Sequence, residues 1–251
     1  MNNIIPALAG YRTQENNLSD DRGFETGIKR FGTMVYAALT SGGKDSILSV
    51  QKAIDLGIDV SHLVTVRPGN PASLMFHSSN LDIVPVIARL SGLGYVEIQT
   101  EGEDEEELDD LYHGLSAIDI EGVVIGAINS VSQRDMVLAI ARDLEIEMVA
   151  PLWLMDAEAV LTEVASRMDA IIVVTADGLG EEMLGSHIDD AFIANLKQIA
   201  ARTHLDLAGE GGGYESIALY APFYSRPVRF SDKRTVHRRT GRYELVLGGF
   251  S

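Results

Sequence analysis

The stretch from residue 36 to residue 46 constrains this chain most, because it places an apolar strand, a glycine turn and a helix start in direct succession. Gly42 and Gly43 have no Cβ atom, so the backbone can turn sharply and bring its N–H groups close to an anion. A helix that begins near Asp45 would point its unpaired N–H groups and its positive dipole end at the same place. Further donors, two hydroxyl groups and one ammonium group, come from Ser41, Ser46 and Lys44. The sequence therefore predicts a phosphate-binding loop.

The spacing of this loop differs from that of the common nucleotide-binding loop. That loop needs a glycine, four residues and then Gly-Lys-Ser/Thr, whereas Asp45 follows Lys44 here, which disfavours a kinase or GTPase. The six residues from Ser41 to Ser46 closely resemble the loop of the PP-loop ATP pyrophosphatases. This resemblance implies cleavage of ATP to AMP and pyrophosphate with adenylation of an acyl or carbonyl oxygen. An ordinary strand-to-helix turn is the alternative, and the strand–loop–helix context favours the functional interpretation.

Composition narrows the classes of function. The chain has 251 residues, is 46% hydrophobic and contains no cysteine, which excludes disulfides, thiolate metal sites and cysteine nucleophiles and is consistent with a cytoplasmic location. The net charge of −17 argues against direct nucleic-acid binding and favours a protein or small-molecule substrate, although a generally acidic proteome explains the charge equally well. No run of about 18 apolar residues is present, so no membrane association is expected.

The pattern along the chain predicts three segments. Residues 1–33 are polar and aperiodic, which is typical of a disordered extension. Residues 34–145 alternate strands and helices and indicate a parallel sheet covered on both faces; residues 146–251 indicate a smaller α+β domain with a C-terminal hairpin. The expected strands are 35–39, 62–66, 95–99, 122–125, 170–174 and 217–220, with a hairpin of 228–238 and 243–247. The expected helices are 46–56, 82–93, 103–116, 132–144, 156–168 and 189–202.

Further candidate site residues follow the strands of the predicted sheet. Ligands in such sheets lie at the carboxyl ends of the strands. Gly126, Gln133 and Arg134 come after the fourth expected strand, and His77 lies in a long loop after the second. Arg134 could equally be an ordinary arginine on a helix surface. A lone histidine such as His77 more often has a structural role.

A glycine run lies in the second domain, where Glu210 and Glu215 bracket three consecutive glycines. It is either a flexible linker or a segment that approaches a substrate closely. A local basic cluster in the C-terminal hairpin, either a docking surface or simply solvated, consists of Arg226, Arg229, Lys233, Arg234, Arg238 and Arg239.

Taken together, these pieces resemble the diphthine–ammonia ligase family, archaeal type, in order and spacing from Met34 to about Pro227. The motifs that carry the resemblance are 41–46, 75–77, 126–128 with Ser130, Gln133 and Arg134, 151–153, 178–179, 184–185, 188–189 and 209–212 with 214–215. The resemblance implies an α/β fold with a parallel-sheet adenine nucleotide α-hydrolase-like (HUP, PP-loop) domain followed by a smaller α+β domain. It also implies ATP-dependent amidation by ammonium of diphthine, a modified histidine of translation elongation factor 2, giving diphthamide, AMP and pyrophosphate.

The resemblance implies roles for these residues. The loop 41–46, His77, Gly126, Gln133 and Arg134 would bind ATP, with Lys44 stabilising the charge that develops on pyrophosphate. Asp45 would hold Mg²⁺ between phosphate oxygens. Glu210 or Glu215 would deprotonate ammonium before attack, or hold the trimethylammonium group of diphthine.

The chain departs from the family pattern at two positions of the glycine-rich motif. Gly213 stands where the family has a glutamate, and Ser216 stands where it has a threonine. Two alternatives therefore stay open. The first is a PP-loop ligase that amidates another carboxylate, such as a cobalamin precursor, and the second is a non-catalytic adenine-nucleotide sensor.

Overall fold

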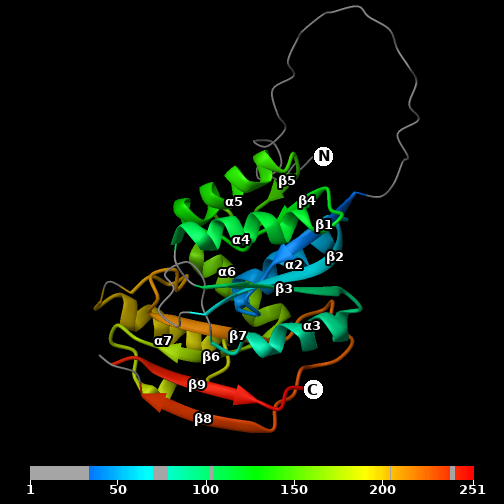
Figure 1. The fold of residues 1–251 in the computed structure, drawn as a ribbon. Helices are drawn as coiled ribbons and strands as arrows, with labels where there is room; N and C mark the ends of the chain where they lie inside the picture. Colours follow the sequence, from blue (N-terminus) through cyan, green and yellow to red (C-terminus); the bar gives the residue numbers. More distant parts are fainter. Residues whose placement is uncertain (1–33, 70–78, 102–103, 204, 238–240) are drawn as a thin grey trace, which may run out of the picture.

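The computed structural model describes residues 34–69, 79–101, 104–203, 205–237 and 241–251. These described residues form a five-stranded sheet and a four-stranded sheet, with helices around and between them (Figure 1). The expected extension 1–33 and His77 lie outside the described residues.

The first sheet is parallel throughout, with the strand order β3-β2-β1-β4-β5. It consists of β1 (Val35–Leu39), β2 (Asp59–Pro68), β3 (Gly94–Thr100), β4 (Gly122–Val124) and β5 (Glu147–Val149). The parallel sheet predicted from the sequence is thus confirmed. The sequence analysis missed β5, which has three residues and carries too little pattern to be read as a strand.

Helices cover both faces of this sheet, because neighbouring strand residues point to opposite sides. Ala38 and Leu63 pack on the side of α2 (Lys44–Asp55) and α3 (Val84–Ser91), where a short 3₁₀ turn, η1 (Leu81–Ile83), precedes α3. Ala37 and Val64 pack on the opposite side, where α4 (Asp104–Ser116) and α5 (Val131–Asp143) lie together (Figure 1). Both faces of the strands are therefore buried, as their near-continuous apolar sequences require.

The second sheet is antiparallel, with the strand order β7-β6-β9-β8. It consists of β6 (Asp169–Thr175), β7 (Tyr214–Tyr220), β8 (Asp232–His237) and β9 (Tyr243–Gly248). The predicted C-terminal hairpin is confirmed as β8 and β9. The remaining elements are α6 (Ala157–Arg167), η2 (Glu181–Met183) and α7 (Asp190–Ala200).

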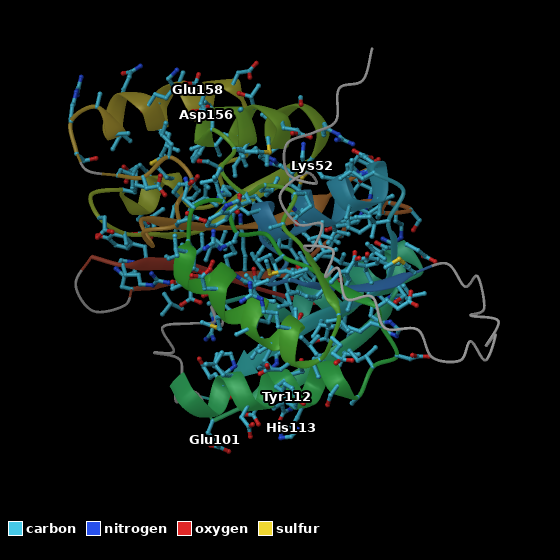
Figure 2. The ribbon with its side chains drawn as sticks, turned by 90° about the horizontal axis from the view of Figure 1, so that it is seen from above. Lys52, Glu101, Tyr112, His113, Asp156 and Glu158 are labelled. Atoms are coloured by element: carbon cyan, nitrogen blue, oxygen red, sulfur yellow. The ribbon has the colours of Figure 1, made fainter. Side chains whose placement is uncertain are left out.

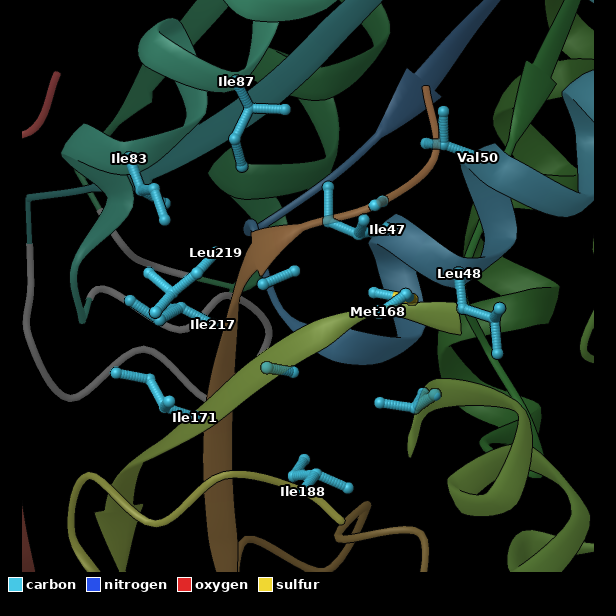
Figure 3. Close-up of a cluster of buried hydrophobic side chains, with 14 of the residues drawn as sticks. Ile47, Leu48, Val50, Ile83, Ile87, Met168, Ile171, Ile188, Ile217 and Leu219 are labelled. Atoms are coloured by element: carbon cyan, nitrogen blue, oxygen red, sulfur yellow. The ribbon is translucent and has the colours of Figure 1, made fainter. Parts of the chain in front are cut away.

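A single buried cluster joins the two sheets. Ile47 and Leu48 of α2 belong to the same apolar cluster as Ile171 of β6 and Ile217 of β7 (Figure 3). Burial of each such side chain contributes about 1.5–3 kcal/mol relative to exposure. This packing holds β7 against the start of α2, which is where the predicted phosphate-binding loop lies.

Ion pairs on the surface tie α6 to the helices beside it. Lys52 of α2 contacts Glu163 of α6 at 2.9 Å, and Lys197 of α7 contacts Glu158 of α6 at 2.6 Å; Figure 2 labels Lys52 and Glu158. Asp156 begins α6 as its N-cap and accepts a hydrogen bond from the Ala159 N–H. These ion pairs connect α6 to α2 on one side and to α7 on the other.

A polar cluster lies on β2 and β3 of the first sheet. Glu97 Oε2 accepts hydrogen bonds from Arg67 Nε at 3.0 Å and from the Tyr95 hydroxyl at 2.8 Å. Partial burial raises the pKa of Glu97, but the Tyr95 and Arg67 hydrogen bonds outweigh burial, so its pKa lies below its ordinary value. Burial and the hydrogen bond to Glu97 together raise the pKa of Tyr95 to about 12.

Within the described residues, no helix is both long enough and apolar enough to cross a membrane.

Candidate active site

The strand order of the first sheet reverses between β1 and β4, and this reversal creates the site. The chain leaves β1 toward α2 on one face and leaves β4 toward α5 on the other. In open parallel sheets, ligands bind in the crevice that forms at such a reversal. The predicted phosphate-binding loop lies at this point.

The loop between β1 and α2 is shaped by Gly42 and by hydroxyl groups around it. Gly42 has a φ of +78°, and a Cβ atom there would lie 2.7 Å from Ile83 Cγ2, so only glycine fits. Thr40 Oγ1 accepts the Gly42 N–H at 2.9 Å and lies 2.9 Å from Ser46 Oγ. Gly43 begins α2 without any side-chain cap.

The second sheet contacts this loop through β7. The Lys44 N–H donates to Ser216 Oγ at 3.2 Å, and the Ala218 N–H donates to the Gly42 carbonyl at 2.9 Å. A Cβ atom on Gly43 would lie 3.2 Å from the Ser216 carbonyl oxygen. Sequence reasoning noted the Ser216 hydroxyl only as part of the glycine-rich motif and did not place it on the loop.

Gly126 lets the loop after β4 approach the start of α2. A Cβ atom on Gly126 would lie 2.8 Å from both the N and the Cα atoms of Ser46, and 3.0 Å from the Asp45 carbonyl carbon. These are backbone atoms, which cannot rotate away. The two loops on either side of the crevice are therefore in direct contact.

A cavity of about 250 Å³ lies between these loops and β7. It gathers most of the residues predicted from the sequence, from both parts of the chain. Those that line it are Ser41, Gly43, Lys44, Asp45, Ser46, Gly126, Gln133, Glu210 and Glu215. Gly42 shapes the loop from behind, against Ile83.

Arg134 lies apart from this group. Its guanidinium group stacks over the Trp153 ring, 4.4 Å from the centroid, and bonds to its neighbour Asp135. It is absent from the cavity lining, although Gln133 beside it is present there. The structure thus brings Gln133 into the site and places Arg134 against Trp153.

Lys44 is 4% exposed and has its ammonium group fully surrounded. Nζ donates to Asp45 Oδ2 at 2.7 Å and to the Ala208 carbonyl at 2.6 Å, and it lies 4.9 Å from the centroid of the Tyr214 ring. Burial lowers the pKa of Lys44, but the charges and hydrogen-bonding groups of Asp45 and Tyr214 together outweigh burial, so the pKa lies above its ordinary value. The Lys44 side chain carries a positive charge inside the cavity wall.

Asp45 has one oxygen paired and one free of hydrogen bonds. Oδ2 pairs with Lys44, whereas Oδ1 is inaccessible to solvent and receives no hydrogen bond from any described group. Burial raises the pKa of Asp45 and the nearby Lys44 charge lowers it, with the net direction upward. A buried carboxylate oxygen without a partner is costly, and it is a suitable donor for a hard cation.

Glu210 connects the second part of the chain to the loop after β4. Its Oε1 accepts the N–H groups of Ile128 and Asn129 at 2.9 and 3.0 Å, and its Oε2 also accepts the Asn129 N–H at 3.0 Å. The carboxylate therefore clasps two backbone donors across the crevice.

Glu215 forms an ion pair with Arg242, the residue that immediately precedes β9. Sequence reasoning missed Arg242, because it comes 27 residues after its partner and no motif surrounds it. Gly213 lies outside the cavity lining, and a Cβ atom there would lie 2.3 Å from Leu205 Cδ1. At residue 213, where the chain departs from the family pattern, a side chain would therefore contact Leu205.

The parallel sheet, its strand order and the loop after β1 define a PP-loop domain of the adenine nucleotide α-hydrolase type, joined to an antiparallel second part. Comparison with known families gives a match to the diphthamide synthase N-terminal domain over residues 34–148 and to the diphthamide synthase C-terminal domain over residues 156–246. The chain belongs to the diphthamide synthase family.

Curated relatives named diphthine–ammonia ligase agree with this assignment. The relative from Rattus norvegicus is 30% identical over 223 residues, covering 78% of this chain and 82% of the relative. The relative from Danio rerio is 29% identical, with 81% and 89% covered. The relative from Schizosaccharomyces pombe is 28% identical over 83% of this chain, and the match spans 38% of that longer protein. The family is thus one of ligases that form carbon–nitrogen bonds, and its PP-loop domain implies use of ATP.

A solved structure titled as a predicted subunit of tRNA methyltransferase from Methanocaldococcus jannaschii aligns with 75% of this chain and 98% of its own, at 16% identity and a TM-score of 0.43. A similarity at this level adds nothing to the assignment.

Proposed function

We propose that this protein amidates the carboxylate of diphthine on translation elongation factor 2 with ammonia, at the expense of ATP, through an acyl-adenylate. The observation that carries the proposal is the single cavity in which the loop 41–46 meets Glu210 and Glu215 from the other part of the chain. One wall has donors for phosphate and the other has carboxylates for a cationic reactant. A ligase that joins a carboxylate to ammonia needs both.

In this proposal the loop 41–46 and the start of α2 hold the phosphates of ATP. A carboxylate resists attack by ammonia because its leaving group would be oxide. Attack of the carboxylate oxygen on the α-phosphate forms a bond to phosphorus, breaks the bond to pyrophosphate and leaves AMP as the later leaving group. The Lys44 ammonium group and the N–H groups at the helix start stabilise the charge that develops on pyrophosphate.

Mg²⁺ fits the site through Asp45. Its Oδ1 atom is buried and receives no hydrogen bond from any described residue, and carboxylate oxygen is a ligand that Mg²⁺ prefers. When bound, the ion would neutralise phosphate charge. A direct test is titration of Mg²⁺ into the protein with a non-hydrolysable ATP analogue, where Asp45→Asn should weaken binding of the metal.

Ammonia is mostly ammonium at neutral pH and must lose a proton before it attacks. Glu210 and Glu215 both line the cavity, and we assign the attraction and deprotonation of ammonium to this pair. Their hydrogen bonds to backbone N–H groups and to Arg242 keep both carboxylates in place. The carboxylate accepts one proton from ammonium, and neutral ammonia then attacks the acyl carbon, expels AMP and loses a second proton to become the amide nitrogen; both protons end in solvent.

The deciding experiment analyses nucleotide products with Mg-ATP and ammonium, with and without elongation factor 2 that carries diphthine. AMP and pyrophosphate that form only with this substrate, together with a mass change from acid to amide, would support the proposal. AMP formation with a small carboxylate such as a cobalamin precursor, and none with the factor, would assign another acceptor. Tight ATP binding without any AMP would favour a nucleotide sensor.

A matched pair of variants controls this experiment. Lys44→Met removes the cation from the cavity wall and should abolish AMP formation. Lys52→Met removes a lysine from the same helix that pairs with Glu163 on the surface, and it should leave the rate within about twofold.

A further inference from the structure

Asn80 links η1 to the second sheet. Its Oδ1 atom accepts the Leu247 N–H at 2.8 Å, and its Nδ2 atom donates to the Leu245 carbonyl at 3.0 Å. Both partners belong to β9, and they follow directly on residues 243 and 244, where β9 pairs with β6. The Asn80 amide therefore satisfies one donor and one acceptor of the β9 backbone, as a neighbouring strand would.

η1 supports the predicted phosphate-binding loop from behind. The Asn80 carbonyl accepts the Ile83 N–H at 3.1 Å and so closes the turn. Ile83 is fully buried, in the same apolar cluster as Ile217 and Leu219 of β7 (Figure 3). A Cβ atom on Gly42 would lie 2.7 Å from Ile83 Cγ2, and the Gly42 carbonyl is bonded to β7. The position of Gly42 therefore depends on η1 as well as on β7.

The residue before Asn80 reaches the cavity. Ser79 lines the cavity, and its hydroxyl group donates to Glu244 of β9 at 2.6 Å. η1 is also tied to the first sheet, because Asp82 pairs with Arg67 of β2 at 2.8 Å. The Asp82 side chain is 80% exposed, however, so this ion pair contributes little. The bonds to β9 are therefore the main polar link of η1.

We propose that Asn80 is a positioning residue for ATP binding, because its side chain joins η1 to β9 and η1 supports the loop 41–46. This inference rests on the part of the proposed function that assigns ATP binding to the loop 41–46. Without the link to β9, η1 and Gly42 would spend part of the time in arrangements that do not fit the phosphates. The apparent affinity for ATP then falls with the fraction of competent protein, whereas the bound state is unchanged.

A simpler role for Asn80 concerns its backbone alone. Asn80 has a φ of +60°, in the left-handed region that asparagine adopts more readily than most residues. Asn80→Gly keeps this backbone conformation accessible and removes both hydrogen bonds to β9. If the backbone conformation is all that matters, this variant should bind ATP as the wild type does.

The matched control is Glu145→Gly. Glu145 also has a positive φ, of +55°, and lies exposed in the turn between α5 and β5. It does not line the cavity. Glycine at this position carries a similar entropic cost through the unfolded state, so the control accounts for general destabilisation.

A milder variant is Asn80→Asp. It keeps an oxygen that accepts the Leu247 N–H and loses the donor to the Leu245 carbonyl. Its ATP affinity should lie between those of the wild type and Asn80→Gly, and it provides the test if Asn80→Gly does not fold.

Three measurements compare these proteins: calorimetric binding of a non-hydrolysable ATP analogue with Mg²⁺, urea unfolding, and hydrogen exchange of residues 40–46 without nucleotide. We expect Asn80→Gly to bind the analogue about tenfold more weakly, or about 1.4 kcal/mol, since two net hydrogen bonds contribute an amount of this order. The hydrogen-bonded N–H groups of Gly42 and Lys44 should exchange faster in this variant. In AMP formation its KM for ATP should rise, whereas its kcat should stay within about twofold of the wild type. Glu145→Gly should match the wild type in binding and in exchange.

Several results would overturn the positioning role. One is equal ATP affinity in Asn80→Gly and the wild type, whether or not stability falls. A second is a loss of the same size in Glu145→Gly, which would assign the effect to general destabilisation. A third is unchanged exchange of residues 40–46 in Asn80→Gly.

The same measurements separate this inference from the proposed function. If the wild type binds the analogue and Asn80→Gly binds it more weakly, but no amidation of elongation factor 2 occurs, the positioning role stands and the proposed reaction fails. If the wild type binds no ATP, both the proposed function and the role of Asn80 in ATP binding fail. The exchange measurement then still shows whether Asn80 holds the loop 41–46, because it is made without nucleotide.

Discussion

Substitution of Gly126 by alanine tests the geometry of the crevice directly. The added Cβ atom would lie 2.8 Å from the backbone N and Cα atoms of Ser46, whereas ordinary contacts begin at 3.4 Å. Backbone atoms cannot rotate aside, so α2 and the loop after β4 must separate by about 0.6 Å at this point. The same displacement moves Asp45 and the first N–H groups of α2 relative to the position that we propose for the phosphates of ATP.

The expected cost has two parts. Overpacking of this kind destabilises a protein by about 1–3 kcal/mol. A displacement of about 1 Å in groups that position a substrate can cost on the order of a hundredfold in rate. We therefore expect Gly126→Ala to lower the free energy of unfolding by about 1–3 kcal/mol and kcat/KM for ATP by about 10- to 100-fold.

The assay combines urea unfolding, calorimetric ATP binding and AMP formation. Gly248→Ala is the matched control, because its Cβ atom would meet only Asp232 Cβ at 3.6 Å, an ordinary contact far from the loop 41–46 in the chain. The control should change neither quantity appreciably. Unchanged stability and ATP affinity in Gly126→Ala would refute the argument that contact between the two loops sets the site.

Three further predictions concern single side chains. Glu210→Gln keeps an acceptor oxygen for the backbone N–H groups, so if Glu210 only holds these groups, ATP binding should stay near normal. If Glu210 deprotonates ammonium, kcat should fall greatly and rising pH should partly restore it. The pH profile of kcat distinguishes the two roles. Arg242→Gln should leave ATP affinity unchanged and raise KM for ammonium by a few-fold, because Glu215 loses the charge that holds it. Arg242→Lys keeps the charge and should restore most of the KM. Equal defects in both variants would contradict this role of Arg242. Glu97→Gln should cost about 0.5–1 kcal/mol of stability at neutral pH. The lowered pKa of Glu97 gives stability above its ordinary pKa that disappears as pH falls through the folded value, so urea unfolding of variant and wild type should converge in acid.

The sequence predicted those parts of the site that depend on neighbouring residues. The loop 41–46 is continuous in the chain, and its glycines, hydroxyl groups and helix start act over a few residues, so spacing alone predicts it. The alternation of strands and helices predicted the parallel sheet in the same way. The capping of α5 by Ser130 and of α7 by Asp189 is equally local.

Only the tertiary structure decided which distant residues meet at the cavity. The Lys44 N–H and Ser216 are 172 residues apart, and Glu210 is 82 residues from the Ile128 N–H that it binds. Such pairs leave no periodic signal, because the packing of β7 on α2 brings them together. For the same reason the sequence left Arg134 open, missed Arg242 and did not reveal β5, whose three residues become a strand only by pairing with β4. Local chemistry can be read from spacing, whereas contact across the crevice depends on how the two sheets pack.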